Sequence, residues 1–198
     1  MKDGPILALD LATATGWAYG APGSVPRSGT IRFASPGATC GEVGCGLMRW
    51  LSDFLAVCLV SKVYFEAPFD PRHMGNKTNF NTTRILVGIP FLLETLLDAK
   101  GIMHVREVTV GDVRKHFLGK DRRGDEGKTQ VQAKCRTLGW DFDSADAADA
   151  LAVWSFACAV EAPAVATATS PLFQSAFAAP SPRVRPSFGY DDIEDIPA

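Results

Sequence analysis

The chain has 198 residues, 46% of them hydrophobic, and a formal net charge of −2 at pH 7, as expected for one globular domain with a buried core. Its five cysteines are scattered without a Cys-x-x-Cys pair, and no apolar run reaches transmembrane length. These features argue against a disulfide framework, a zinc site and a membrane-spanning helix. We expect the first residues to form a strand rather than a signal peptide, and therefore a cytoplasmic protein of a bacterium or a phage-infected host cell.

The N-terminal third of the chain is predicted to form three short strands and a helix. The apolar run 6–11 is typical of a buried strand, and segments 13–20 and 28–33 alternate between apolar and polar residues with Gly and Pro between them. This pattern predicts an antiparallel meander. Apolar residues at helical spacing then indicate a helix over 42–59.

The remaining elements are predicted as follows. Strands are expected at 62–69 and 104–108, and a long apolar helix at 79–100 is expected to kink or begin afresh at Pro90. Three helices follow at 110–118, 128–138 and 144–160, with a loop at 120–127. This order predicts an α/β fold in which helices cover both faces of a mixed sheet of about five strands.

The composition changes near residue 161, where Ala, Pro, Ser and Thr become dominant. A segment of this kind cannot bury enough apolar surface to fold by itself. We therefore expect a folded domain over 1–160 and a disordered tail over 161–198 that ends in an acidic tip.

Four acidic residues lie where a buried carboxylate would be costly. Asp10 ends the first strand, Glu66 lies near the end of the fourth, and Asp146 and Asp149 share one face of an otherwise apolar helix. If the first and fourth strands are neighbours and the helix crosses the sheet, the four side chains can converge. Such a site has oxygen ligands only and suits Mg²⁺ or Mn²⁺.

Each acid also has a simpler interpretation. A single carboxylate at the end of a strand, such as Asp10 or Glu66, often reaches solvent. An acid in the first turn of a helix, such as Asp146, complements the helix dipole. Capping does not explain Asp149, because this residue lies in the second turn, directly before the apolar part of the helix.

Positive charge is concentrated in one stretch of the chain. Residues 100–136 contain ten Lys or Arg and five Asp or Glu, an excess of five, whereas residues 1–159 carry 18 minus 17, or +1. A basic band beside an acidic site suits a phosphate polymer held near a metal, although a solvated helical face would have the same composition.

The positions of these residues resemble the RuvC family of Holliday-junction resolvases, which have an RNase H-like fold. The resemblance covers residues 5 to about 160. It rests on Asp10, on Glu66, on the stretches 113–119 and 128–132, and on the helix that carries Asp146 and Asp149. Family members carry a basic residue in the first of these stretches and a catalytic lysine at the start of the second.

The resemblance implies a homodimeric, Mg²⁺-dependent endodeoxyribonuclease of DNA recombination and repair that nicks branched DNA. Two Mg²⁺ ions, with Mn²⁺ as a substitute, would be held by the four carboxylates. One would lower the pKa of the attacking water and the other would stabilise the leaving 3′ oxygen. Lys128 would be catalytic and lie beside the scissile phosphate. Predicted DNA contacts are Phe69 as a stacking aromatic, and Arg114, Lys115, Arg122, Arg123 and Lys77 on phosphates.

Some features depart from the family pattern. The segment 120–127 is longer than usual, Pro90 lies in the helix that the family uses for dimerisation, and the tail is an addition. These differences favour a divergent, phage-type member that cuts a wider range of branched DNA. Two other classes stay open: a non-catalytic branched-DNA-binding protein of the same fold, and an actin-like ATP-binding fragment, since 9–20 resembles a first phosphate loop.

Two further partners are predicted. The helix at 79–100 has more apolar surface than one side of a helix needs, at Ile85, Ile89, Leu92, Leu93, Leu96 and Leu97, and this favours a homodimer that is buried partly through it. The tip 188–198 resembles the acidic terminus of bacterial single-stranded-DNA-binding proteins with Ala198 in place of the last phenylalanine, so it is a candidate for a weak protein contact or for self-inhibition over the basic band.

Overall fold

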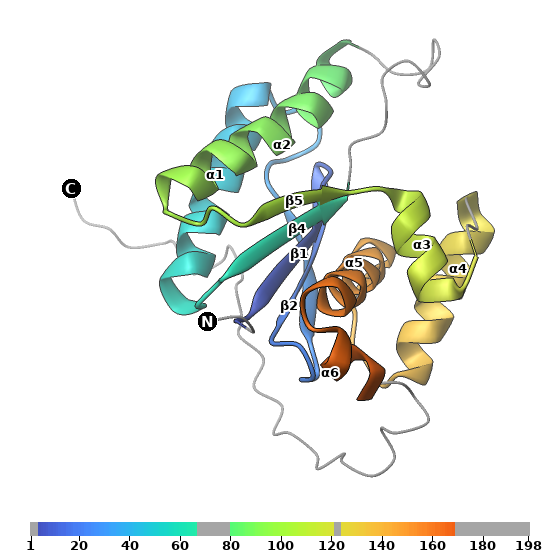
Figure 1. The fold of residues 1–198 in the computed structure, drawn as a ribbon. Coiled ribbons are helices and arrows are strands. Elements are labelled where there is room, and N and C mark those ends of the chain that lie inside the picture. Colours follow the sequence, from blue (N-terminus) through green and yellow to red (C-terminus); the bar gives the residue numbers. More distant parts are fainter. Residues whose placement is uncertain (1–3, 67–79, 121–123, 169–198) are drawn as a thin grey trace.

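The computed structural model describes residues 4–66, 80–120 and 124–168. Five strands form one mixed sheet in the order β3-β2-β1-β4-β5 (Figure 1). Their bounds are Ile6–Asp10 (β1), Ala14–Gly20 (β2), Arg27–Arg32 (β3), Lys62–Glu66 (β4) and Val105–Val108 (β5). The pairs β1–β2 and β2–β3 are antiparallel, and β1–β4 and β4–β5 are parallel, so the predicted meander with added parallel strands is confirmed.

Six helices are described, and they cover both faces of the sheet (Figure 1). The helices α1 and α2 lie on one face, and α3, α4 and α5 lie on the other. The helix bounds are Cys40–Val57 (α1), Phe80–Ala99 (α2), Val110–Leu118 (α3), Gly124–Thr137 (α4), Ala145–Glu161 (α5) and Pro163–Ala168 (α6). None of the helices in the described segments is both long enough and apolar enough to cross a membrane.

Alternation along β1 decides which core each side chain joins. Leu7 and Leu9 pack on the face of α1 and α2, whereas Ile6 and Ala8 pack on the face of α5. By the same period of two, Asp10 lies on the face of α5. The two cores are thus separated by a sheet whose central strand is fully buried on both sides.

The helix α5 is the centre of its face of the sheet. Ten of its residues are buried, and five of these are alanines, at positions 147, 148, 150, 152 and 157. A helix that is apolar on all sides is expected in an interior, and small side chains allow its axis to lie close to the strands. The hydroxyl of Ser144 caps the helix by accepting a hydrogen bond from the amide of Ala147 at 3.0 Å.

Three elements differ from their predicted bounds. The helix α4 begins at Gly124, so Lys128 lies in its second turn, and residues 124–127 are helix rather than loop. The helix α2 continues through Pro90 without a new start. The helix α6 occupies part of the segment that was expected to be disordered, because the chain after α5 folds back on it. The rest of the predicted tail, from residue 169 with its acidic tip, lies outside the described residues.

A polar network fixes the C-terminal end of α5 to the sheet. The Glu161 carboxylate accepts hydrogen bonds from Lys62 at 2.5 Å, from the Tyr64 hydroxyl, and from His104 at 2.8 Å. Burial acts to raise the pKa of Glu161, but these three hydrogen bonds outweigh it and lower the pKa to about 2. The network therefore stabilises the folded chain wherever Glu161 is ionised.

We expect Glu161→Gln to lower the free energy of unfolding at pH 7 by roughly 1–3 kcal/mol, because it removes a charged acceptor from three donors. The folded pKa lies below the ordinary value of 4.5, so this stabilisation is complete above about pH 4.5 and declines as the pH falls toward 2. Urea unfolding at pH 7 and at pH 3 measures it.

The matched control is Glu107→Gln, on the exposed side of β5, which is expected to leave stability unchanged. A difference between Glu161→Gln and the wild type that is the same at both pH values would contradict a role for the ionised carboxylate.

Candidate active site

Asp10 and Glu66 lie side by side at the carboxyl edge of the parallel strands. The register pairs Leu9 of β1 with Phe65 of β4, and Asp10 and Glu66 are the next residues along each strand. Tyr64 packs in the same core as Ala8, so Glu66, two residues further, lies on the face of α5 together with Asp10. The predicted convergence of these two acids is therefore present.

The first two turns of α5 bring Asp146 and Asp149 toward the same edge. Burial, and then the negative charges of Asp149 and Asp146, raise the pKa of Asp10 to about 7. Burial, and then the charges of Asp10 and Asp149, raise the pKa of Glu66 to about 8. Burial also raises the pKa of Asp149. The four carboxylates thus share one electrostatic environment, drawn from β1, β4 and α5.

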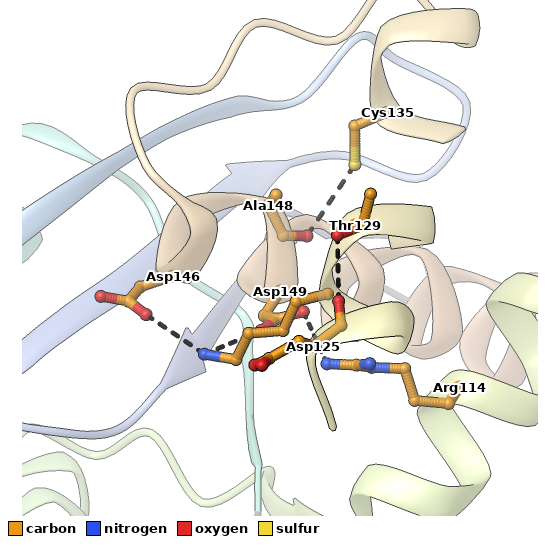
Figure 2. A network of polar contacts seen from close by, with 8 residues as sticks. Arg114, Asp125, Thr129, Cys135, Asp146, Ala148 and Asp149 are labelled. Carbon is orange, nitrogen blue, oxygen red and sulfur yellow. Dashed lines mark hydrogen bonds and ion pairs between the residues drawn. The ribbon is translucent and has the colours of Figure 1, made fainter. Parts of the chain in front are cut away.

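Two cations offset part of this negative charge (Figure 2). Arg114 of α3 donates a hydrogen bond to Asp149 over 2.9 Å, and both side chains are 6% exposed. The Lys128 ammonium of α4 lies 3.9 Å from an oxygen of Asp146 and 3.8 Å from an oxygen of Asp149. Lys128 is 48% exposed, so it faces both the acids and the solvent.

The position of Arg114 changes its predicted role. The residue is buried and ion-paired, so the structure does not place it on the surface as a phosphate contact. A sequence signal for this burial exists, because Arg114 follows the buried Val113 and precedes the buried Phe117 by three positions, on the inner side of an amphipathic helix.

Of the other predicted DNA contacts, only one lies in the described part of the chain. Lys115 is exposed on α3, as a phosphate contact requires. Phe69, Lys77, Arg122 and Arg123 lie outside the described residues.

Contacts between α4 and α5 hold Lys128 in position. The Cys135 thiol donates to the carbonyl of Ala148 over 3.8 Å, and burial raises the pKa of this thiol to about 12, so it keeps its proton (Figure 2). Val131 is fully buried in the same core. These packing contacts place the second turn of α4 beside the first turns of α5.

The donor set of the site suits a hard divalent cation. Its donors are four carboxylates, and among the described residues no side-chain hydrogen bond or ion pair reaches the carboxylate of Asp10 or of Glu66. In the arrangement of the described side chains, no three acids, histidines or cysteines gather closely enough to hold one ion. The chemistry of four carboxylate donors fits Mg²⁺ or Mn²⁺, and at the present spacing Arg114 contacts Asp149 and Lys128 lies near Asp146 and Asp149.

The fold is similar to that of solved resolvases. Thermus thermophilus RuvC in complex with a Holliday junction matches with a TM-score of 0.58 and 16% identity, over 76% of this chain and 90% of that one. A second structure of Thermus thermophilus RuvC matches with a TM-score of 0.55 and 16% identity, over 79% of this chain and 95% of that one. The yeast mitochondrial Holliday junction resolvase Ydc2 matches with a TM-score of 0.51 and 11% identity, over 87% and 84%.

The sequence of the chain, unlike its fold, has no significant match. No protein-family profile matches the chain, and no curated protein is significantly similar to it. The likeness to these resolvases is therefore one of fold, and it confirms the predicted RNase H-like, RuvC-type α/β architecture.

The raised pKa values predict how the stability of the metal-free protein changes with pH. The folded pKa of Asp10, about 7, is above its ordinary value of 3.8, so the fold loses stability as the pH rises from about 3.8 to about 7, and the full loss is present above pH 7. We expect Asp10→Asn to raise the free energy of unfolding at pH 8 by about 1 kcal/mol or more, and to change it much less at pH 4, close to the ordinary pKa of 3.8.

Thermal unfolding in a chelator measures this effect. Asp98→Asn, on the exposed surface of α2, is the control that removes a charge elsewhere and is expected to have no such effect. Equal stability of wild type and Asp10→Asn at pH 8 would show that the carboxylates do not repel one another.

Proposed function

We propose that the chain is a metal-dependent endodeoxyribonuclease that nicks Holliday junctions or other branched DNA. The observation that carries this proposal is the gathering of Asp10, Glu66, Asp146 and Asp149 at one edge of the sheet, with raised pKa values at three of them. The likeness in fold to solved Holliday-junction resolvases supports the choice of substrate.

In this proposal the four carboxylates hold the divalent cations. Bound Mg²⁺, or Mn²⁺ in its place, supplies an activated water and charge stabilisation at the scissile phosphate. The acids themselves orient the cations and exclude other ligands. Asp10 and Glu66 come from the rigid centre of the sheet, which favours a fixed position for their oxygens.

The two cationic side chains have different tasks. Lys128 is half exposed, so its ammonium can turn from Asp146 and Asp149 to a phosphate oxygen and offset the charge that develops there. Arg114 is buried. Its charge opposes the rise in the pKa of Asp149, and their hydrogen bond orients that carboxylate. Arg114 is thus a positioning residue rather than a DNA contact.

Binding of DNA is proposed to depend on exposed basic residues near the site. Lys115, Lys120 and Lys128 are exposed or half exposed on α3, after it, and on α4. Contacts of this kind are made to phosphates, so they give affinity that falls with salt and little reading of sequence.

We expect Asp146→Asn to reduce cleavage of a synthetic four-way junction at least a hundredfold, and to change junction affinity less than tenfold, or 1.4 kcal/mol. The reason is that catalysis depends on the acids, while affinity depends on the basic residues. Gel assays of cleavage in Mg²⁺ and of binding in Ca²⁺, with junction, flap and linear duplex side by side, measure both and define the substrate.

Asp141→Asn is the matched control, because Asp141 is an exposed acid in the loop before α5. It is expected to cleave like the wild type. Binding of the junction by the wild type without any metal-dependent cut would favour the non-catalytic DNA-binding protein instead.

The helix α2 is the proposed dimer surface, but through other residues than the sequence indicated. Ile85, Ile89, Leu93 and Leu97 are buried in the core against α1, and Leu92 and Leu96 pack beside them. The exposed apolar residues of α2 are Phe80, Val87 and Phe91, at 78%, 50% and 72% exposure. Their spacing of seven and four places them on one stripe, together with Arg84, which lies over the Phe80 ring.

Phe91→Glu is expected to yield a monomer at micromolar concentration where the wild type is a dimer, because it puts a charge into the apolar stripe. Light scattering measures the mass. Val25→Glu, at an equally exposed residue before β3, is the control and is expected to stay a dimer. A monomeric wild type would contradict the assignment.

A further inference from the structure

A glycine allows the first turn of α5 to touch the sheet. Gly16 of β2 lies directly across from Asp10 of β1 in the antiparallel register. A side chain at Gly16 would place its Cβ 1.9 Å from the carbonyl oxygen of Asp146 and 2.8 Å from the amide nitrogen of Ala147. Ordinary contacts need roughly 3.5 Å, and both atoms belong to the helix backbone. The helix therefore rests on the strand at this point without any intervening side chain.

A second contact fixes the same turn from the edge of the sheet. The backbone amide of Thr30 donates to Asp143 over 3.2 Å, and its hydroxyl donates to the other Asp143 oxygen over 2.9 Å. The Thr30 hydroxyl is also hydrogen-bonded to the hydroxyl of Ser144, the N-cap of α5. Since Ser144 in turn accepts from the amide of Ala147, Thr30 is connected to the first helical turn through hydrogen bonds alone.

The two contacts act on the same face. Ala18 packs in the core of α5, so Gly16, two residues before it, lies on that face. Thr30 pairs with Gly16 across β2 and β3, so the two positions are neighbours in the sheet. The contact at Gly16 sets the distance of α5 from the strands. The hydrogen bonds of Thr30 set where the first residue of α5 lies along the strands.

We propose that Gly16 and Thr30 are positioning residues that set the place of Asp146 relative to Asp10. The inference rests on the proposed metal-dependent function. Asp10, Gly16 and Thr30 are successive residues across three strands, and Asp146 is the residue whose backbone lies on the middle one. A side chain at Gly16 moves Asp146 away from Asp10, and loss of the Thr30 hydroxyl lets the same turn slide.

Two pairs of variants separate this role from general stability. Gly16→Ala is compared with Gly29→Ala, since the methyl group at Gly29 meets the Trp17 ring, at 3.0 to 3.1 Å, on the opposite face of the sheet. Thr30→Val, which keeps the shape and loses the hydroxyl, is compared with Thr30→Ser, which keeps the hydroxyl. The affinity for Mn²⁺ is measured by calorimetry on the DNA-free protein, beside the thermal midpoint in chelator.

We expect Gly16→Ala to weaken Mn²⁺ binding at least tenfold and Thr30→Val severalfold, with Gly29→Ala and Thr30→Ser within twofold of the wild type. Displacements of about 1 Å in such sites cost on the order of a hundredfold in rate, so junction cleavage is expected to fall with the affinity. The thermal midpoint of Gly29→Ala is expected to drop without a loss of Mn²⁺ affinity, which separates folding from positioning.

Wild-type affinity for Mn²⁺ in both Gly16→Ala and Thr30→Val would overturn the inference and leave the proposed function intact. If Gly16→Ala does not fold, the comparison of Thr30→Val with Thr30→Ser decides alone, and equal affinities overturn it. A wild type without saturable Mn²⁺ binding would overturn the proposed function, and this inference with it.

Discussion

Repulsion between carboxylates at the edge of a sheet is the constraint on which the rest of the candidate site depends. Asp10 and Glu66 are adjacent because β1 and β4 are parallel neighbours, and α5 adds two more acids to the same edge. Such a group is unstable unless positive charge or protons are nearby. The α3 and α4 helices supply the positive charge as Arg114 and Lys128. Burial first, and then the charges of the neighbouring acids, still raise the pKa values of Asp10 and Glu66.

The composition of α5 follows from the same constraint. Acids at its N-terminal end can reach Asp10 only if the helix lies directly on the strands, and alanines on the inner side together with Gly16 make that approach possible. At the other end Glu161 is held by three donors from β4 and from the residue before β5. The helix is thus fixed at both ends by polar contacts and along its length by small apolar side chains.

Much of this arrangement was predictable from the sequence, and the part that was not has a physical reason. The apolar run of β1, the alternation in the segments 13–20 and 28–33, and the three-residue spacing of Asp146 and Asp149 are local signals. The sheet, the helices and the positions of the four acids could therefore be predicted. The helical spacing around Arg114 indicates its burial, but no local pattern contains its ion-pair partner Asp149, which lies 35 residues away. The early start of α4 and the continuous α2 depend on packing that outweighs the preferences of Gly and Pro. The close contact at Gly16 joins residues 130 positions apart and leaves only a glycine in a strand as its signal.

In the proposed function, the balance of charge indicates how the site would pass from the metal-free to the metal-bound state. Four carboxylates and two cations sum to −4 plus +2, or −2. This net charge of −2 can be neutralised by two protons or by one divalent cation. Because the pKa values of Asp10 and Glu66 are about 7 and 8, either the protons or the cation can neutralise it near neutral pH. Arg114 is enclosed and stays with Asp149, whereas Lys128 is half exposed and can leave Asp146. Departure of Lys128 toward a phosphate would increase the negative charge around the acids and so strengthen their hold on a cation. If the proposed function holds, the arrival of DNA and the binding of metal would support each other through the half-exposed ammonium group of Lys128.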